Sequence, residues 1–302
     1  MQTTDPVNGL LGEALKEIAA TRFSGVLRVD GSPGATVYVS GGGIAACETP
    51  GAPSLEVVLL RSRRVSESDW DAAFAAAAIA NRHMTTELVK RELVRAGELE
   101  ALLRTALADA IFALVSGRVD ACHAEMSAVS SPLSLTPAAR SGWLLAEATR
   151  RMQVLASFPE PAVSAQDRIA VAPVALVPAD AADTVRRGLA PGLGEAEILA
   201  LADGRRTARD LAFALGRGLY ATLLQLTRMR ANGLVVIRPP GSEYPPDEEP
   251  GAPPQGGDDN EATVSGLPRR RKDRASPPRA IAASVQMLRP RTPRSAKPDE
   301  TL

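Results

Sequence analysis

Residues 23–47 read FSGVLRVDGSPGATVYVSGGGIAAC. Short runs of strand-forming residues alternate here with two turn sequences, DGSPG and GGG, whose glycine, proline and aspartate residues are those that tight turns favour. The runs are Val26–Val29, Thr36–Val39 and Ile44–Cys47. Short strands joined by tight turns predict an antiparallel meander, and this meander decides the fold of the first half of the chain.

Helical patterns flank the meander on both sides. Before it, Leu11, Leu15 and Ile18 have the i, i+4, i+7 spacing of an amphipathic helix. After it, the expected elements are a helix that starts at the S-x-x-D sequence Ser66–Asp69, helices over about 86–97 and 98–116, and a strand over 119–124. Together these elements predict an α+β domain of short antiparallel strands and helices over residues 1–133.

A smaller helical pattern follows after a connection. Residues 134–190 predict a linking helix over about 137–157 and then an irregular, proline-containing connector. The signals after it are a helix over 195–202, a stop at Asp203-Gly204, a T-x-x-D capping box at Thr207–Asp210, a Gly216–Gly218 turn, a helix over 219–231 and a strand over 234–237. Three helices and a strand predict a winged-helix-like domain over residues 191–238.

The last 64 residues differ sharply in composition. Residues 239–302 hold 13 of the 24 prolines and few large apolar residues, so they predict a disordered tail. Seven acids and no base lie in 243–261, whereas ten bases and one acid lie in 268–297. The densest basic residues are Arg269, Arg270, Arg271 and Lys272, which are candidate contacts for nucleic acid or another anionic surface. The acidic block is expected to fold back on the basic block and weaken that affinity at low salt.

Several stretches of the first half resemble a known family. The matching segments are Gly9–Leu11, Phe23–Val29, Val37–Ala46, Ala110–Leu114, Gly117–Val119 and Leu144–Arg151. Over about residues 8–156 they resemble the PATAN (PatA N-terminal-like) domain. The resemblance implies a non-enzymatic module of bacterial signalling that binds proteins, with small Ras-like GTPases or roadblock-type proteins as partners. No receiver-domain constellation accompanies it, so direct phosphorelay input is not expected.

Residues able to carry catalysis or bind a metal are scarce. The chain has two cysteines and two histidines. Cys122 and His123 are adjacent on an expected strand and would point to opposite faces, which disfavours a shared metal ion or a nucleophile pair. The glycine triplet lacks the lysine of a P-loop and precedes a strand, so it predicts a turn and not a phosphate cradle. We therefore expect no enzyme activity, no cofactor and no metal.

Composition also bears on location and charge. Thirty-five basic and 35 acidic residues give a formal net charge of zero, which excludes a uniformly basic nucleic-acid binder. The N-terminal residues lack the charged and apolar regions of a signal peptide, and no apolar run reaches the 18–20 residues of a membrane span. These features predict a cytoplasmic protein.

Two functions remain open. The first is a cytoplasmic signalling adaptor whose two domains bind protein partners or complete a homodimer. The alternative is a transcriptional regulator in which the helix over 219–231 contacts DNA. Residues 191–238 carry seven arginines against four acids, a modest basic excess. The candidate contact residues, expected to point outward, are Arg217, Tyr220, Gln225, Arg228 and Arg230.

Overall fold

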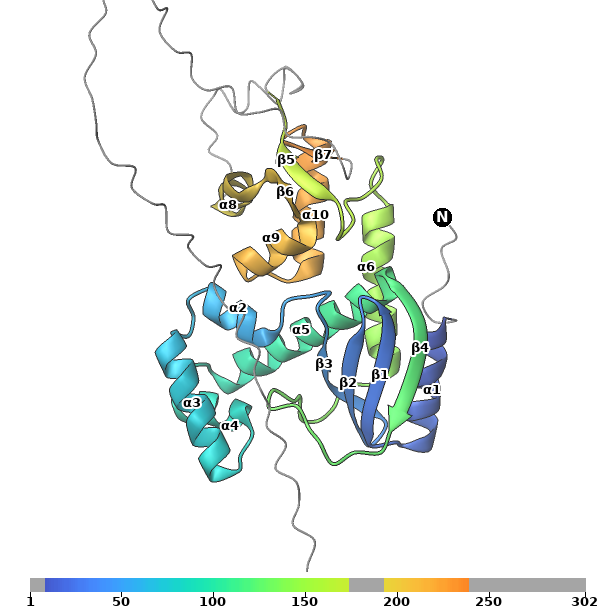
Figure 1. Ribbon diagram of the computed structural model, residues 1–302, viewed down its shortest axis with the longest axis vertical. Helices are drawn as coiled ribbons and strands as arrows, with labels where there is room; N and C mark the ends of the chain where they lie inside the picture. Colours follow the sequence, from blue (N-terminus) through green and yellow to red (C-terminus); the bar gives the residue numbers. More distant parts are fainter. Residues whose placement is uncertain (1–8, 174–192, 239–302) are drawn as a thin grey trace, which may run out of the picture. The chain divides into compact units, whose positions relative to one another are not determined.

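The predicted meander is present as three strands of an antiparallel sheet in the computed structural model, which describes residues 9–173 and 193–238 (Figure 1). The strands are β1 (Gly25–Ser32), β2 (Ala35–Ser40), β3 (Gly43–Glu48) and β4 (Arg118–Glu125). Their order in the sheet is β3-β2-β1-β4. Leu27 lies opposite Val37 on β2, and Val29 lies opposite Cys122 on β4. The predicted tail over 239–302 lies outside the described residues.

Six helices accompany this sheet in the described residues up to 173. They are α1 (Leu10–Thr21), α2 (Leu55–Arg61), α3 (Glu67–Ala80), α4 (Met84–Lys90), α5 (Ala96–Ser116) and α6 (Ser141–Ala156). The predicted start of α3 is confirmed, because the Ser66 hydroxyl accepts a hydrogen bond of 3.1 Å from the Asp69 N–H. The helix expected over 86–97 is shorter than predicted. It ends at Lys90, and Glu92 then adopts a φ of +57°, which a continuing helix does not allow.

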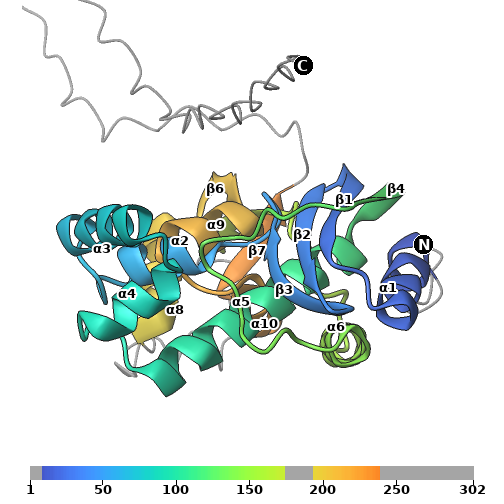
Figure 2. The same cartoon turned by 90° about the horizontal axis from the view of Figure 1, so that it is seen from below.

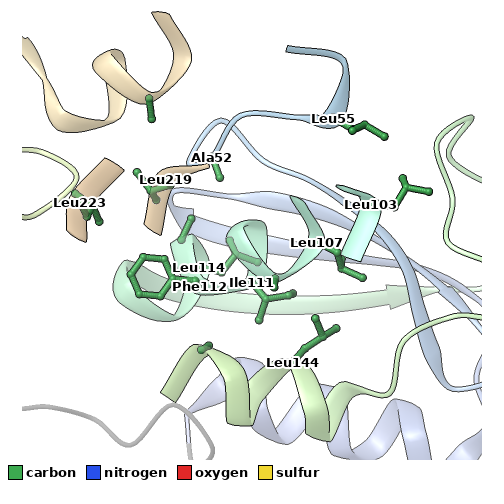
Figure 3. Close-up of a cluster of buried hydrophobic side chains, with 14 of the residues drawn as sticks. Ala52, Leu55, Leu103, Leu107, Ile111, Phe112, Leu114, Leu144, Leu219 and Leu223 are labelled. Atoms are coloured by element: carbon green, nitrogen blue, oxygen red, sulfur yellow. The ribbon is translucent and has the colours of Figure 1, made fainter. Parts of the chain in front are cut away.

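The core of the first part forms where α5 packs on the sheet and on α6 (Figure 3). Buried residues of the sheet include Leu27, Val37 and Ile44, and the helices add Ile111 and Leu144. The predicted apolar stripe of α1 is confirmed as buried. Full burial of each such side chain contributes about 1.5–3 kcal/mol. Figure 2 shows that α3 and α4 lie at the opposite end of α5 from the sheet.

The second group of elements forms its own three-stranded sheet. Its elements are β5 (Arg168–Val171), α8 (Leu193–Leu201), β6 (Asp203–Thr207), α9 (Ala208–Leu215), α10 (Leu219–Ala231) and β7 (Val235–Arg238). We call these elements the small module. The capping box is confirmed: Thr207 Oγ1 accepts a hydrogen bond from the Asp210 N–H, and Asp210 Oδ2 accepts one from the Thr207 N–H. The described residues are therefore α+β, as predicted.

One expectation about the small module is wrong. The order of its sheet is β6-β5-β7, so its central strand lies at 168–171, where the sequence predicted an irregular connector. The stop predicted at Asp203-Gly204 is confirmed, because α8 ends at Leu201 and these two residues then begin strand β6. Four-residue and five-residue strands are too short to show an alternating pattern, and β5 gains its hydrogen bonds from partners more than 30 residues later in the chain.

All described residues belong to one compact unit. The small module meets the first part along α2, α5 and α6. Among the described residues, no helix is both long and apolar enough to cross a membrane.

Candidate functional site

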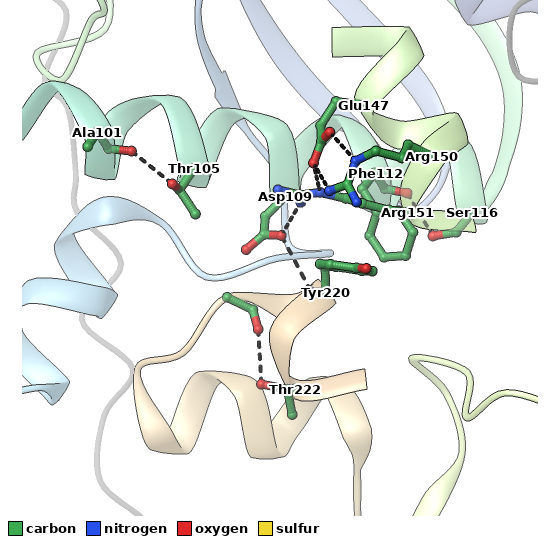
Figure 4. Close-up of polar contacts among 11 residues, drawn as sticks. Ala101, Thr105, Asp109, Phe112, Ser116, Glu147, Arg150, Arg151, Tyr220 and Thr222 are labelled. Atoms are coloured by element: carbon green, nitrogen blue, oxygen red, sulfur yellow. Dashed lines mark hydrogen bonds and ion pairs between the residues drawn. The ribbon is translucent and has the colours of Figure 1, made fainter. Parts of the chain in front are cut away.

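Tyr220 does not point outward as predicted. The tyrosine is half-buried, and its ring lies edge-to-face against Phe112 of α5 with 5.6 Å between the ring centroids (Figure 4). The guanidinium carbon of Arg151 lies 4.9 Å from the centroid of the tyrosine ring. The expectation failed because α10 packs against α9 and β7 and also against α5 and α6, so one apolar stripe does not describe its buried surface.

Arg217 and Gln225 bind groups of the small module itself. Arg217 donates a hydrogen bond of 3.3 Å to the carbonyl of Gly194 and forms an ion pair with Glu197. The Gln225 amide donates a hydrogen bond of 3.0 Å to the carboxylate of Glu195. Both side chains therefore hold α8 against the start and middle of α10.

Arg230 and Arg228 have different surroundings. Arg230 donates a hydrogen bond of 2.8 Å to the carbonyl of Pro161 and forms an ion pair of 3.4 Å with Glu160. Arg228 is exposed and forms no ion pair with another described residue. The structure therefore does not gather the five predicted contact residues on one free face. The predicted tail contacts Arg269, Arg270, Arg271 and Lys272 lie outside the described residues.

A buried ion pair lies where the small module meets the first part. Asp109 of α5 is 3% exposed, and Arg151 of α6 is 7% exposed. Arg151 donates a hydrogen bond of 2.5 Å from its guanidinium to Asp109 Oδ1, and its Nε donates one of 2.8 Å to Glu147 (Figure 4). Asp109 Oδ1 also accepts a 3.4 Å hydrogen bond from the backbone N–H of Tyr220.

Asp109 thereby caps α10 from another helix. The residue in the cap position of α10 is Gly218, which supplies no side-chain hydrogen bond to the helix. The first N–H groups of a helix have no partner within the helix, and a carboxylate there is also favoured by the helix dipole. A Cβ atom on Gly218 would lie 2.1 Å from Asp109 Oδ2, so only glycine allows this approach.

The charges of this junction shift two carboxyl groups in opposite directions. Hydrogen bonds from Arg150 and Arg151 lower the pKa of Glu147 to about 2. Burial raises the pKa of Asp109, although Arg151 and the backbone N–H groups of α10 act against that rise. Glu147 is therefore a firm anion at neutral pH, whereas the ionised form of Asp109 depends on Arg151.

A second close approach joins the small module to α2. Gly216 ends α9 in the left-handed conformation, with a φ of +61°. A Cβ atom on it would lie 2.5 Å from the Cβ atom of Arg61. The sequence predicted the Gly216–Gly218 turn correctly but gave no reason for two glycines. The structure supplies that reason, because each glycine allows contact with a different helix of the first part.

The C-terminal part of α3, which follows the exposed acids of its first turns, exposes apolar side chains. Residues 72–80 contain seven alanines, one phenylalanine and one isoleucine, and no charge. Phe74 is 54% exposed and Ile79 is 88% exposed, while Ala73 and Ala77 form the buried side. An apolar helix face that is open to solvent is a mark of protein–protein contact.

The two cysteines lie on opposite edges of the four-stranded sheet. Cys47 is on β3 and Cys122 is on β4, so two strands and about 14 Å separate them. Burial and the neighbouring Glu48 carboxylate raise the pKa of Cys47 to about 12, which keeps the thiol protonated at neutral pH. His123 faces solvent and Asp30, 3.4 Å away. Within residues 9–173 and 193–238, no group of three or more potential metal ligands comes together.

A cavity of about 540 Å³ lies between β3, α5 and the loop before α2. Its wall is mostly apolar, and Phe213 of α9 closes one side. Its polar groups include Cys47 and Glu48, but the Glu48 carboxylate already accepts hydrogen bonds from Tyr38 and Ser131. Glu56 also lines the cavity, and burial and the neighbouring Asp71 carboxylate raise its pKa, but the Cys47 thiol on the same wall is held protonated.

One signal in the sequence pointed to the buried junction. Asp109 interrupts the apolar run of residues 106–115, and a lone acid in such a run needs a buried partner. The partner, Arg151, lies 42 residues later on another helix, so spacing alone could not identify it. Comparisons with known proteins give no further guide, because no family model, no curated protein and no solved structure matches this chain.

Proposed function

We propose that this protein is a non-enzymatic signalling adaptor that binds a partner protein through the exposed apolar face of α3. The observation that carries the proposal is the uncharged surface formed by residues 72–80, on which Phe74 and Ile79 project into solvent. Apolar side chains of this size gain free energy when a partner removes them from water.

The junction around Asp109 supports this function indirectly. The hydrogen bond from the Tyr220 N–H to Asp109, the Arg151 guanidinium over the Tyr220 ring and two close glycine contacts join the small module to α2, α5 and α6. Helix α3 therefore belongs to one compact unit and not to one of two loosely linked domains. The resemblance to PATAN domains suggests a small Ras-like GTPase or a roadblock-type protein as the partner.

The same contacts weigh against α10 as a DNA-reading helix. Such a helix must expose the side chains that enter the groove. Tyr220 is instead packed between Phe112 and Arg151, and Arg217 and Arg230 bind acids of this chain. DNA affinity, if measured for the full chain, is therefore assigned to the basic residues of the tail.

The proposal is tested by binding measurements with purified full-length chains. Wild type and the double variant Phe74→Glu/Ile79→Glu are titrated with the small Ras-like GTPases and roadblock proteins of the source genome. Leu10→Glu is the matched control, because Leu10 is also an exposed apolar residue, 51% accessible, on a different helix. Sedimentation of each chain reports its oligomeric state in parallel.

The proposal predicts that one of these proteins binds wild type and Leu10→Glu equally and fails to bind the α3 variant. Unimpaired binding by the α3 variant would overturn it. A wild-type dimer that the α3 variant converts to a monomer, with no partner bound by either, would instead make this face a homodimer interface.

DNA binding is measured on the same chains with a salt series. The proposal predicts that any affinity disappears when Arg269, Arg270, Arg271 and Lys272 are replaced with glutamine. Affinity that persists in this tail variant, weakens with salt and falls further in Arg228→Glu would favour a transcriptional regulator instead.

A further inference from the structure

A wide basic groove lies between the end of α1, the β2–β3 turn and the start of α6. Its volume is about 1120 Å³, and it is separate from the apolar face of α3. Four basic side chains from three helix regions line it: Lys16, Arg22, His83 and Arg140. No acidic residue in the described part of the chain lines it.

The cations of this groove lack the partners that most others have. Many exposed arginines elsewhere pair with a carboxylate, such as Arg104 with Glu100 at 2.9 Å. Lys16, Arg22 and Arg140 form no ion pair with another described residue. Three unpaired cations around one hollow attract an anion more strongly than scattered charges do, because their potentials add.

Neutral groups of the groove also suit an anion. Ser141, at the start of α6, is 7% exposed and lines the groove, and its hydroxyl forms no hydrogen bond with another described residue. The first N–H groups of α6 lie beside it without a side-chain cap. Trp143 lines the same groove and is 45% exposed.

The glycine turn forms a wall of the groove but is not itself a phosphate cradle. The N–H of Gly41 donates to the Ser24 hydroxyl at 2.8 Å, and the N–H of Gly42 donates to the Phe23 carbonyl at 2.8 Å. Donors used within the chain cannot bind a phosphate. The positive charge of the groove therefore comes from its lysine and arginine side chains and not from the glycine turn. The volume of the groove also exceeds the usual 300–1,000 Å³ of a small-molecule site.

We propose that this groove binds the acidic block of the chain's own tail, residues 243–261. This block carries seven acids and no base, which complements a groove with several cations and no acid. It begins five residues after Arg238, the last residue of β7. The 20–23 residues between Arg238 and the last acids of the block, Asp258 to Glu261, extend up to about 66–83 Å, which exceeds the width of a 240-residue folded unit, so these acids can reach the groove. Tethering also gives the block a high effective concentration at the groove.

Carbodiimide cross-linking of the full chain tests the proposal directly, since the reagent joins a lysine amine to a carboxylate in contact. The chain has four lysines, of which Lys16 lines the groove and Lys90 is an exposed internal control on α4. Mass spectrometry at low salt should find the acids of 243–261 joined to Lys16 several-fold more often than to Lys90. The Lys16 product should fall as salt rises.

Matched variants make the test specific. Arg22→Gln/Arg140→Gln neutralises the groove and keeps Lys16 as the reporter, so its Lys16 product should fall several-fold. Arg95→Gln/Arg228→Gln removes two exposed charges that have no described ion-pair partner and lie outside the groove, and should match wild type. Mixing unlabelled and ¹⁵N-labelled chains separates products within one chain from products between chains.

Two cross-linking results would overturn the proposal. In one, Lys16 and Lys90 react equally. In the other, the acids join only Lys272 and Lys297, which means that the basic block of the tail holds them. Acrylamide quenching of tryptophan fluorescence is the second measurement; Trp70 is 7% exposed, so the accessible signal comes mainly from Trp143. Replacement of the seven acids with their amides should raise quenching at low salt, and unchanged quenching would also count against the proposal.

Discussion

The buried pair of Asp109 and Arg151 allows a quantitative prediction. Arg151→Met keeps a side chain of similar length and leaves the Asp109 carboxylate buried without its cation. Removing one partner of a buried ion pair costs about 3–5 kcal/mol. For a folded unit of this size, each kcal/mol lowers the melting temperature by about 2–4 °C, so we expect a fall of about 6–20 °C.

The loss should depend on pH. Burial already raises the pKa of Asp109, and Arg151 opposes that rise, so removing Arg151 raises the folded-state pKa further. A carboxyl group with a raised folded-state pKa favours folding when it is protonated, and that contribution is lost as the pH rises through this pKa. Arg151→Met should therefore be less destabilised relative to wild type at pH 5 than at pH 8, as measured by thermal unfolding followed by circular dichroism.

The double variant Asp109→Asn/Arg151→Met separates charge from shape. Asparagine retains an oxygen that can accept from the N–H groups of α10 and leaves no buried charge, so the double variant should be more stable than Arg151→Met alone. The reasoning is refuted if Arg151→Met melts within about 2 °C of wild type, below the smallest loss expected from a broken buried pair. The reasoning also fails if the losses of unfolding free energy of Asp109→Asn and Arg151→Met simply add up in the double variant.

Other predictions concern single side chains. Gly218→Ala should destabilise the fold by more than about 2 kcal/mol, because its Cβ would lie 2.1 Å from Asp109 Oδ2. Gly97→Ala, in an open position of α5, should instead stabilise the fold by about 0.5–1 kcal/mol. Chemical denaturation measures the free energy of unfolding of both variants. Glu147 has a pKa of about 2 instead of 4.5, so its contribution is present above pH 4.5 and lost toward pH 2, and Glu147→Gln should flatten that acid limb of a stability–pH curve. Iodoacetamide at pH 8 should leave Cys47 unmodified in the folded chain, where its pKa is about 12, and alkylate it in urea, as mass spectrometry can show.

Features that depend on neighbouring residues could be predicted from the sequence. The meander followed from turn residues between strand-forming runs, and the capping box at Thr207 and Asp210 needs only four consecutive residues. The start of α3 at Ser66 is confirmed for the same reason. In each case the partners of the hydrogen bonds lie close together in the chain.

Features that depend on distant contacts could not be predicted in this way. Strand β5 is four residues long and becomes recognisable only beside β6 and β7. Tyr220 follows directly after a buried leucine and looks outward on a helical wheel, but α5 and α6 cover its side of α10. The apolar face of α3 was visible as an alanine-rich run, yet only the fold shows that Phe74 and Ile79 remain uncovered.

The capping of α10 by Asp109 has a consequence for how this architecture can be rearranged in evolution. The elements over residues 193–238 depend on the preceding chain twice: β5 supplies the central strand of their sheet, and a carboxylate of α5 completes the first turn of α10. A gene segment encoding only residues 191–238 would lack both. This segment is therefore poorly suited to transfer on its own between unrelated genes, and α5, α6, β5 and α10 are expected to be inherited together.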